Sequence, residues 1–270
     1  MRKMKILYQK IKRTNPAIVF LQETKCQANF IQERRSKIWA RCESMGIDST
    51  GFSGGLCILW DPSQVSLSDF QGTRNSISAN FKVVGFPISG ALTNVYGPQH
   101  SGDKRSFLKS LSNLKTLMPL EHWVVGGDFN LINSLEEKKG GRRCLEEECN
   151  LCHNTIEDLG LVDITLGVGW FTWNNKRTGD RHIASRLDRF LVYESVINLG
   201  SEIHSSTLSA RGSDHWPIEL MWSGLGSQFK NIFVLSNFGS LIPNLKIRLK
   251  PGGLKCNPIR FLICGPSNKI

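Results

Sequence analysis

The stretch Trp123-Val124-Val125-Gly126-Gly127-Asp128-Phe129-Asn130 joins an apolar run to an acid and an amide. The apolar residues predict a buried strand at 123–127, because such runs are typical of sheets covered on both faces. The two glycines permit a close turn of the backbone, and Asp128 and Asn130 fall on one side of an extended chain. The stretch therefore predicts an α/β domain with polar side chains at the end of a strand.

Short strands and helices follow one another along most of the chain. The helical patterns lie before Asn15 and at 30–45, 105–118 and 145–159. The strand patterns lie at 17–21, 56–60, 65–70, 76–84, 91–96, 185–192 and 215–222. The runs between 56 and 96 are spaced like a β-meander. Strands that are both consecutive and interleaved with helices predict a layered α/β domain with mixed sheets.

Three further polar groups stand at strand ends or turns. Glu23 follows the apolar run 18–21, Asp188 lies inside the strand pattern 185–190, and Asp214 and His215 share a turn. Each of these alone fits a solvated residue or a simple turn equally well. Their occurrence together, in this order with Asp128 and Asn130, favours one shared pocket over four unrelated turns.

Carboxylates, an amide and a histidine in one pocket suit metal-assisted phosphoryl chemistry. Carboxylate oxygens are the ligands that Mg²⁺ prefers, and the bound ion neutralises charge on a phosphate oxygen. Another carboxylate can orient or deprotonate a water molecule, while an imidazolium stabilises the transition state. A neighbouring acid such as Asp188 can hold the imidazole of His215 in position.

The positive charge of the chain belongs to its two ends. The 270 residues carry a formal net charge of +11, with 34 basic and 23 acidic residues. Residues 1–13 hold six basic residues and residues 223–270 hold seven, without an acid in either segment. Residues 14–222 therefore carry 21 basic and 23 acidic residues, a net charge of −2. We expect a basic N-terminal segment, a domain at 14–222, and a basic tail of uncertain structure or a small extra subdomain.

The sequence also excludes several classes of protein. Wholesale disorder is excluded by a content of 40% hydrophobic residues, and no apolar run is long enough to span a membrane. The charged N-terminus lacks the apolar segment of a secretory signal, so we expect a nuclear or cytoplasmic protein that is not secreted.

A group of thiols resembles a zinc site only superficially. Cys144, Cys149, Cys152 and His153 lie close in sequence, but no second ligand pair follows at a suitable distance. Because Cys149 and Cys152 would share the apolar face of a helix, small core side chains are the favoured interpretation over a metal site.

A series of segments resembles the endonuclease/exonuclease/phosphatase superfamily. The segments lie at 15–25, 54–60, 94–98, 126–130, 159–163, 171–173, 186–189 and 213–215. The likeness is greatest to the apurinic-endonuclease-like nuclease domain of plant non-LTR (LINE-type) retrotransposons. The resemblance implies a four-layer α/β sandwich with two facing mixed β-sheets.

The resemblance also implies a role for individual catalytic residues. Tyr96 matches the tyrosine that contacts the scissile phosphate, Asp128 the residue that orients or deprotonates the water, and Asn130 the amide that assists it. Asp188 matches the acid paired with the catalytic histidine, which is His215.

Binding roles follow from the same resemblance. Glu23 matches the family's metal-binding glutamate, and Asp214 an acid beside the metal site. Ser213 and Thr172 match positions that touch the nucleic-acid backbone. The implied cofactor is Mg²⁺, with Mn²⁺ as the alternative, and the implied partner is DNA, with no membrane and no obligate protein partner.

The chain departs from the family at its beginning. Related domains open with a strand that ends in an Asn-containing motif and helps hold the metal, whereas no Asn precedes Asn15. We expect the fold to lack that first strand, as in a fragment of a retroelement, and its activity to be impaired. The leading hypothesis is a Mg²⁺-dependent DNA endonuclease. The alternatives are a phosphatase acting on a small phosphoester and an inactive remnant that binds nucleic acid.

Overall fold

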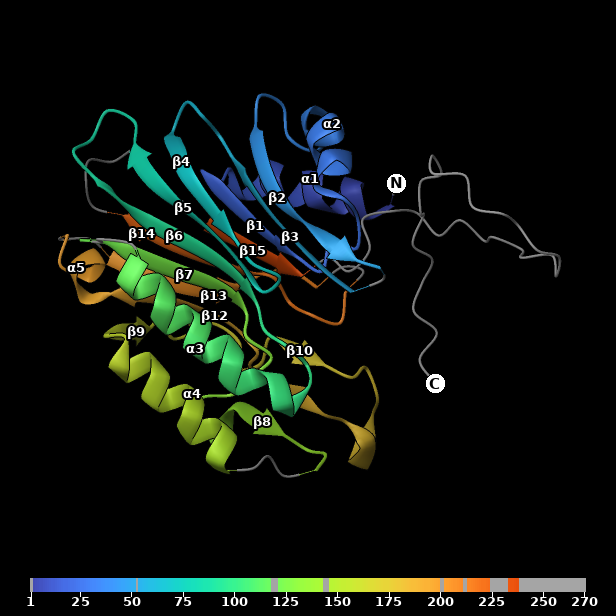
Figure 1. Cartoon of the computed structure of the whole chain (residues 1–270). Coiled ribbons are helices and arrows are strands. Elements are labelled where there is room, and N and C mark those ends of the chain that lie inside the picture. The colour runs from blue at the N-terminus through green and yellow to red at the C-terminus, as the bar shows by residue number, and fades with distance from the viewer. Residues whose placement is uncertain are drawn as a thin grey trace, which may run out of the picture.

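Two six-stranded β-sheets lie face to face, and helices cover their outer faces (Figure 1). The computed structural model describes residues 2–51, 53–117, 121–142, 146–199, 202–210, 213–223 and 233–237. No helix in this described part of the chain is long and apolar enough to cross a membrane. The predicted α/β sandwich with two facing mixed sheets is confirmed.

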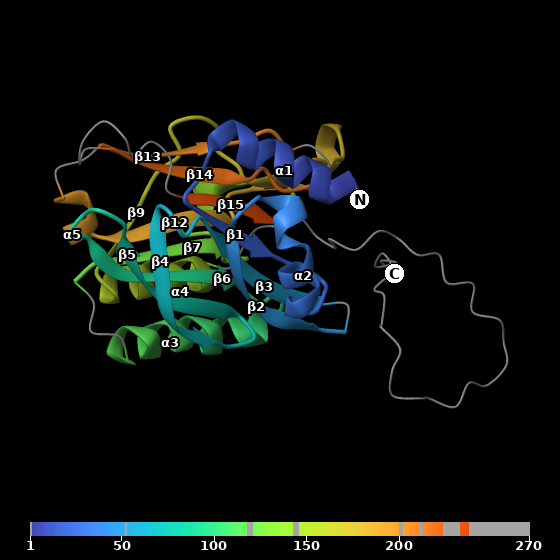
Figure 2. The ribbon, with the colours of Figure 1, turned by 90° about the horizontal axis from the view of Figure 1, so that it is seen from above.

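The first sheet collects strands from both ends of the chain. Its order is β13 (Glu202–Thr207), β14 (Ile218–Ser223), β15 (Phe233–Asn237), β1 (Ile18–Gln22), β3 (Ser53–Trp60) and β2 (Glu43–Thr50). Within this sheet β15 pairs with β1 in parallel, and the other neighbours are antiparallel. Helices α1 (Arg2–Thr14) and α2 (Ala28–Ile38) cover its outer face (Figure 2).

The second sheet is built from the middle of the chain. Its order is β4 (Val65–Gly72), β5 (Ser76–Val83), β6 (Ser89–Tyr96), β7 (Trp123–Asp128), β12 (Asp188–Tyr193) and β9 (Leu161–Asp163). Helices α3 (Ser101–Leu117) and α4 (Glu146–Asp158) pack on its outer face. The short helix α5 (Glu194–Ile197) follows β12 directly.

A small third sheet closes one end of the sandwich. Its strands are β10 (Trp173–Asn174), β11 (Ala184–Ser185) and β8 (Lys138–Lys139). Single turns of 3₁₀ helix at Leu135–Glu137 and Gly179–Arg181 flank these strands.

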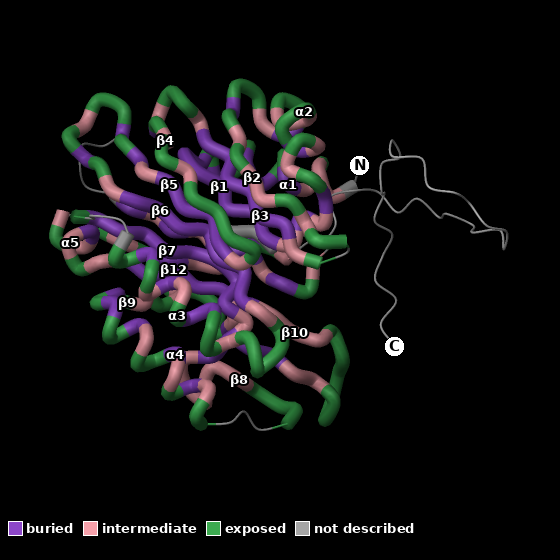
Figure 3. Tube along the Cα trace, viewed as in Figure 1, coloured by how far each residue is buried: buried purple, intermediate pink, exposed green. Residues whose placement is uncertain are grey.

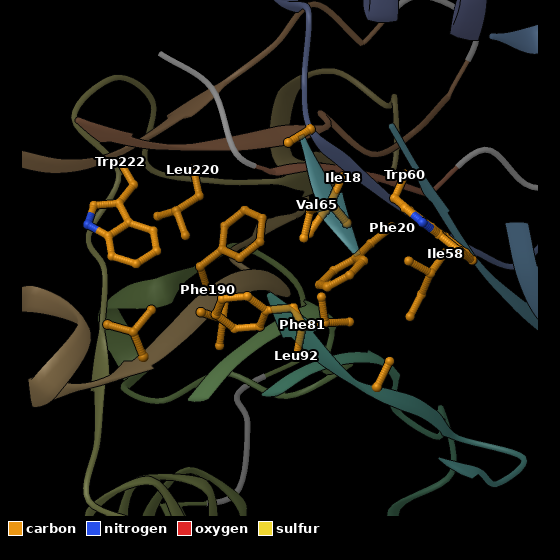
Figure 4. Packing of buried hydrophobic residues seen from close by; sticks show 14 of the residues in the cluster. Ile18, Phe20, Ile58, Trp60, Val65, Phe81, Leu92, Phe190, Leu220 and Trp222 are labelled. Atoms are coloured by element: carbon orange, nitrogen blue, oxygen red, sulfur yellow. The ribbon is translucent and has the colours of Figure 1, made fainter. Parts of the chain in front are cut away.

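Large apolar side chains fill the space between the two main sheets. Phe20 and Ile58 from the first sheet meet Phe81, Leu92 and Phe190 from the second (Figure 4). Buried residues follow the central strands of both sheets (Figure 3). Burial of a side chain of this size contributes about 1.5–3 kcal/mol, so this layer dominates the stability of the domain.

A buried amide joins the two sheets in the same layer. Asn94 of β6 donates hydrogen bonds to the carbonyl oxygens of Leu21 and Cys57, both at 3.1 Å, and accepts one from Gln22 Nε2. An unpaired amide in this position would cost about 1–3 kcal/mol. The bonds therefore fix the end of β1 against β6, which brings Glu23 and Tyr96 to one edge.

The structure corrects several of the expected elements. The helix expected at 30–45 is wrong beyond Ile38, because residues 43–50 form β2. The β-meander is also wrong, since β3 belongs to the first sheet while β4, β5 and β6 belong to the second. A run of apolar residues identifies an extended segment but carries no information about which strand it will pair with.

Two expected strands are shorter than their sequence patterns. The run 185–192 is interrupted at 186–187, between β11 and β12. The run 215–222 becomes strand only at Ile218, and His215 forms an isolated bridge with Trp173 instead. In both places the backbone leaves the regular ladder where polar side chains gather.

The N-terminal and C-terminal segments meet in the first sheet. Residues 2–14 form α1, and among the described residues no strand precedes β1. Within the segment expected to be a basic tail, residues 233–237 form β15 beside β1. Ser223, the first residue of that segment, ends β14, and residues 224–232 and 238–270 lie outside the described residues.

The thiols interpreted as core residues are buried, as expected. Cys149 and Cys152 lie on α4 with exposures of 4% and 0%. Cys144 lies outside the described residues.

Candidate active site

The centre of the candidate site is a histidine between two aspartates. His215 Nδ1 lies 2.8 Å from Asp188 Oδ2, and His215 Nε2 lies 3.8 Å from Asp128 Oδ2. Asp128 and Asp188 are paired positions of the antiparallel ladder between β7 and β12. Because directly opposite residues of such a ladder point to the same face, the two carboxylates are held side by side. We call these three residues the histidine–acid centre.

Burial and mutual charge set the protonation of this centre. Burial raises the pKa of Asp128; the His215 charge opposes this, and the neighbouring Asp188 carboxylate adds to it. Burial alone would lower the pKa of His215, but the carboxylates of Asp188 and Asp128 outweigh it and raise that pKa. The two carboxylates therefore favour the positively charged form of the imidazole.

The backbone around Asp128 is shaped by close contact with β6. Gly127 has a φ of 157°, and a Cβ there would lie 2.0 Å from the carbonyl oxygen of Val95. Asp128 Oδ1 accepts a hydrogen bond of 2.9 Å from the N–H of Asn130. Asn130, in the left-handed region with a φ of 50°, donates from Nδ2 to the carbonyl oxygen of Gly97 at 2.7 Å. The glycine and the amide of the sequence motif thus hold the aspartate rather than form a simple turn.

Residues 172–174 hold Asp188 and Asp214 in place through hydrogen bonds. Thr172 Oγ1 accepts hydrogen bonds of 2.9 Å from the N–H groups of Leu187 and Asp188. Trp173 Nε1 donates to Asp214 Oδ2 at 3.1 Å, and burial of Asp214 is outweighed by His215 and by this bond, so its pKa is lowered. Thr172 is fully buried, so its side chain orients the backbone of Asp188 and is not open to a nucleic-acid backbone.

Ser213 and His215 share a turn. Ser213 Oγ accepts a hydrogen bond of 3.1 Å from the N–H of His215. Ser213 is half-buried, so it remains at the edge of the site, where the resemblance places a nucleic-acid contact.

A second cluster, the glutamate rim, consists of Glu23, Lys25 and Tyr96. Glu23 follows β1 with a φ of 52°, and its Oε1 lies 3.0 Å from Lys25 Nζ. Tyr96 shares a hydrogen bond with Glu23, and burial, Glu23 and Asp128 together raise the pKa of its hydroxyl. Tyr96 is also the ladder partner of Asp128 between β6 and β7. The tyrosine thus connects the glutamate rim to the histidine–acid centre.

A network of buried ions, which the sequence did not predict, adjoins the histidine–acid centre at Asp188. Arg189 is fully buried and binds Glu137 Oε2 at 2.8 Å and Asp163 Oδ2 at 2.7 Å. Arg186 binds the same acids at 2.8 and 2.6 Å. Burial would raise the pKa of Glu137, but Arg189 outweighs it and lowers that pKa. The position of the two arginines on either side of Asp188 is the sequence feature that could have indicated this network. Their acidic partners, however, lie 23 or more residues away in the sequence.

The donor set of the site fits a hard divalent cation. Within the described chain, one group of acid and imidazole side chains has ligand atoms within 4.8 Å of one another: Asp128, Asp188 and His215. Asp188 Oδ1 is buried and has no hydrogen-bond partner among the described residues. Carboxylate oxygens of this kind match Mg²⁺ or Mn²⁺. Glu23 and Asp214 do not belong to this group, but their charges act on Tyr96 and on His215 respectively.

Most of the side chains singled out in the sequence therefore converge. Hydrogen bonds, ladder pairing or close charges connect these side chains across five segments that are remote in sequence. They are Glu23, Tyr96, Asp128, Asn130, Asp188, Ser213, Asp214 and His215.

Solved structures share this fold. The mannosyl-6-phosphatase Bt3783 of Bacteroides thetaiotaomicron VPI-5482 is 13% identical, with a TM-score of 0.59 over 83% of this chain and 91% of that chain. The catalytic domain of Xenopus laevis APE2 is 16% identical, with a TM-score of 0.60 over 86% of this chain and 90% of that chain. The endonuclease domain of TRAS1, a telomere-specific non-LTR retrotransposon, is 15% identical, with a TM-score of 0.54 over 79% and 100%.

These likenesses concern the fold, because the identities are low. A search among curated proteins found no match. A family model described as the endonuclease/exonuclease/phosphatase family matches residues 1–215, which include both the histidine–acid centre and the glutamate rim. The chain belongs to the endonuclease/exonuclease/phosphatase family.

Proposed function

We propose that the protein is a Mg²⁺-dependent phosphodiester hydrolase that nicks DNA, of the kind found in non-LTR retrotransposons. The observation that carries the proposal is the buried arrangement in which His215 lies between Asp188 and Asp128. It combines a positive charge with a carboxylate at one point, as hydrolysis of a phosphate ester requires.

The roles follow from the protonation of the centre. The carboxylate of Asp128, whose pKa is raised by burial, is suited to take a proton from the attacking water. The charged imidazole of His215 stabilises negative charge on the phosphate oxygens, and Asp188 fixes its orientation. Asn130 holds the loop of Asp128, and the hydroxyl of Tyr96 can donate to a phosphate oxygen.

Glu23 and Asp214 are the residues we propose to hold Mg²⁺. Asp128, Asp188 and His215 are the alternative ligand group, but there one imidazole nitrogen of His215 already contacts the Asp188 carboxylate at 2.8 Å. Glu23 is partly exposed, with 23% of its side-chain surface accessible, and can exchange its lysine partner for a cation. A bound divalent ion would neutralise charge on a non-bridging phosphate oxygen.

A nucleic-acid substrate is supported by the surface around the third sheet. Lys176, Arg177 and Arg181 are exposed on the loop between β10 and β11. Trp170, 82% exposed, precedes β10 on a loop that Gly167 fixes through a 2.8 Å hydrogen bond from its N–H to the carbonyl of Ser205. Cations bind the phosphate backbone, and an exposed indole can stack on a base. This combination favours DNA over a small phosphoester.

A plasmid assay tests the proposal. Supercoiled plasmid is incubated with the chain and Mg²⁺, with EDTA as one control. The Asp128→Asn variant should lose nicking, whereas Asp103→Asn, the same change at an exposed acid on α3, should keep it. Equal nicking by the two variants would contradict the assignment and indicate a contaminant.

The same preparation separates the alternatives. Phosphate release from a sugar phosphate without nicking would favour a phosphatase acting on a small phosphoester. Salt-sensitive retention of DNA with neither activity would favour an inactive nucleic-acid-binding remnant.

A further inference from the structure

Strand β15 enters the interior of the first sheet from the C-terminal part of the chain. It lies between β14 and β1 (Figure 2). It runs parallel to β1, from Ile18↔Phe233 to Gln22↔Asn237, and antiparallel to β14, from Ile218↔Leu235 to Leu220↔Phe233. Without β15 the ladder would break between β14 and β1.

The two neighbours of β15 are not built as free edges. All five residues of β1 are buried, and its other edge pairs with β3. Ile218 and Leu220 of β14 have exposures of 0% and 1%. Backbone N–H and C=O groups in such surroundings need partners, and the edges of natural sheets are usually short, charged or covered. The space between β14 and β1 therefore requires a strand.

Both neighbours of β15 lead directly into the candidate site. Glu23 follows the last residue of β1, at the edge where the parallel strand β15 also ends. His215 precedes β14 by three residues, and Ile218 at the start of β14 pairs with Leu235. Within the first sheet, β15 is thus the connection between the segment that carries Glu23 and the segment that carries Asp214 and His215.

We propose that residues 233–237 are a positioning strand, which sets the glutamate rim relative to the histidine–acid centre. The role in activity rests on the proposed hydrolase function, whereas the role in structure does not. Loss of β15 leaves the edge of β1 opposite β3 without a partner strand, and lets Glu23 move away from Asp214. Part of the segment expected to be a basic tail therefore contributes to the site through the backbone pairing of β15.

Engineered disulfides in the full chain test the register. The pair Glu219→Cys with Val234→Cys occupies directly opposite positions of the β14·β15 ladder. In the matched control, Glu219→Cys with Leu235→Cys, the second position is displaced by one residue, so the two positions belong to opposite faces of the sheet. Both are made in a chain with Cys144, Cys256 and Cys264 changed to serine. We expect mild oxidation to link 219 to 234 at least tenfold faster than 219 to 235, measured by peptide mass spectrometry. Equal rates, or no link in either chain, would overturn the proposal.

A proline substitution tests the positioning role. Val234→Pro removes an N–H from the middle of β15 and disfavours the extended ladder, whereas Val234→Ile keeps both. In the proline variant we expect the amides of residues 18–22 to exchange hydrogen at least tenfold faster, with those of 91–95 in β6 unchanged. The nicking rate of the proline variant should fall at least tenfold. The chain with the 219–234 disulfide should nick DNA at the same rate in its oxidised and reduced forms. Unchanged hydrogen exchange of the β1 amides in Val234→Pro would overturn the positioning role of β15, even if no form of the chain nicks DNA. Faster exchange with unchanged nicking would overturn its role in activity.

Discussion

The histidine–acid centre and the glutamate rim are built in opposite ways. Asp128 and Asp188 are paired across one ladder of the second sheet, and both are 1% exposed. Glu23 follows β1 with a φ of 52°, is partly exposed, and has Lys25 as its ion-pair partner. The first cluster is preorganised by the fold, whereas the second can adjust. Under the proposed function, the rigid cluster would transfer the proton, and the adaptable edge would admit a cation and a polymer.

Removing the histidine should have the largest effect. We expect His215→Ala to lower the single-turnover nicking rate by about 10²–10⁴-fold, because the centre loses its positive charge and its link to Asp188. The exposed His153→Ala on α4 is the control and should keep the wild-type rate. A rate near wild type for His215→Ala would show that the buried centre is not where hydrolysis occurs.

The ion network behind the centre is expected to dominate its rigidity. Arg189→Met leaves Glu137 and Asp163 with Arg186 as their one remaining arginine partner among the described residues, so the free energy of unfolding should fall by up to about 3–5 kcal/mol. The control Arg34→Met breaks an exposed pair with Glu33 and should cost at most about 1 kcal/mol. Urea unfolding of both variants measures the difference, and equal losses would mean that the centre needs no such support.

Acid should weaken the same network. The pKa of Glu137 in the folded protein lies below its ordinary value of 4.5, so its contribution is present above that pH. This contribution is lost as the pH falls through the lowered pKa, because the unfolded chain binds the proton more readily. We expect Glu137→Gln to be less stable than wild type at pH 7 and to lose less stability as the pH falls below 4.5. Parallel curves for the two proteins, from urea unfolding at each pH, would argue against a charged Glu137.

Releasing the glutamate rim should have the smallest effect. In Lys25→Met the carboxylate of Glu23 no longer has its ion pair, so Mg²⁺ should meet less competition. Ion pairs at a protein surface contribute about 0.2–1 kcal/mol. On that scale, loss of this partly buried pair corresponds to a fall of about 1.5–5-fold in the Mg²⁺ concentration for half-maximal nicking. The control Lys37→Met, at the last turn of α2, should leave that concentration unchanged. A higher requirement in Lys25→Met would indicate that the lysine assists metal or substrate binding.

Many of the strands, and the polar residues at their ends, could be predicted from the sequence, because both depend on the residues of one short segment. The run 123–127 is the buried strand β7, and Asp128, Asp188 and His215 meet as expected. Thr172 shows the limit of residue matching, since its hydroxyl is fully buried and serves the backbone of Asp188. Nothing in residues 170–174 alone reveals which N–H groups will lie beside that hydroxyl.

The pairing partners of each strand could not be predicted from the sequence. Strand β2 was hidden in an apparent continuation of α2, and its half-exposed pattern carries little periodicity. Asn94 was quoted only as part of a motif, whereas the structure makes it the hydrogen-bonded link between the two sheets. Such roles depend on residues 37 to 73 positions away, and local composition does not encode them.

Local patterns predicted most of the helices and strands, together with the acids and the histidine, because apolar periodicity and residue chemistry are properties of short segments. Only the tertiary structure decided that β15 from residues 233–237 completes the sheet beside β1, and that Arg189 is buried between Glu137 and Asp163. Pairing of strands and ions is chosen by the free energy of the whole core. Each choice depends on which remote segment buries its apolar face and satisfies its polar groups at the same time.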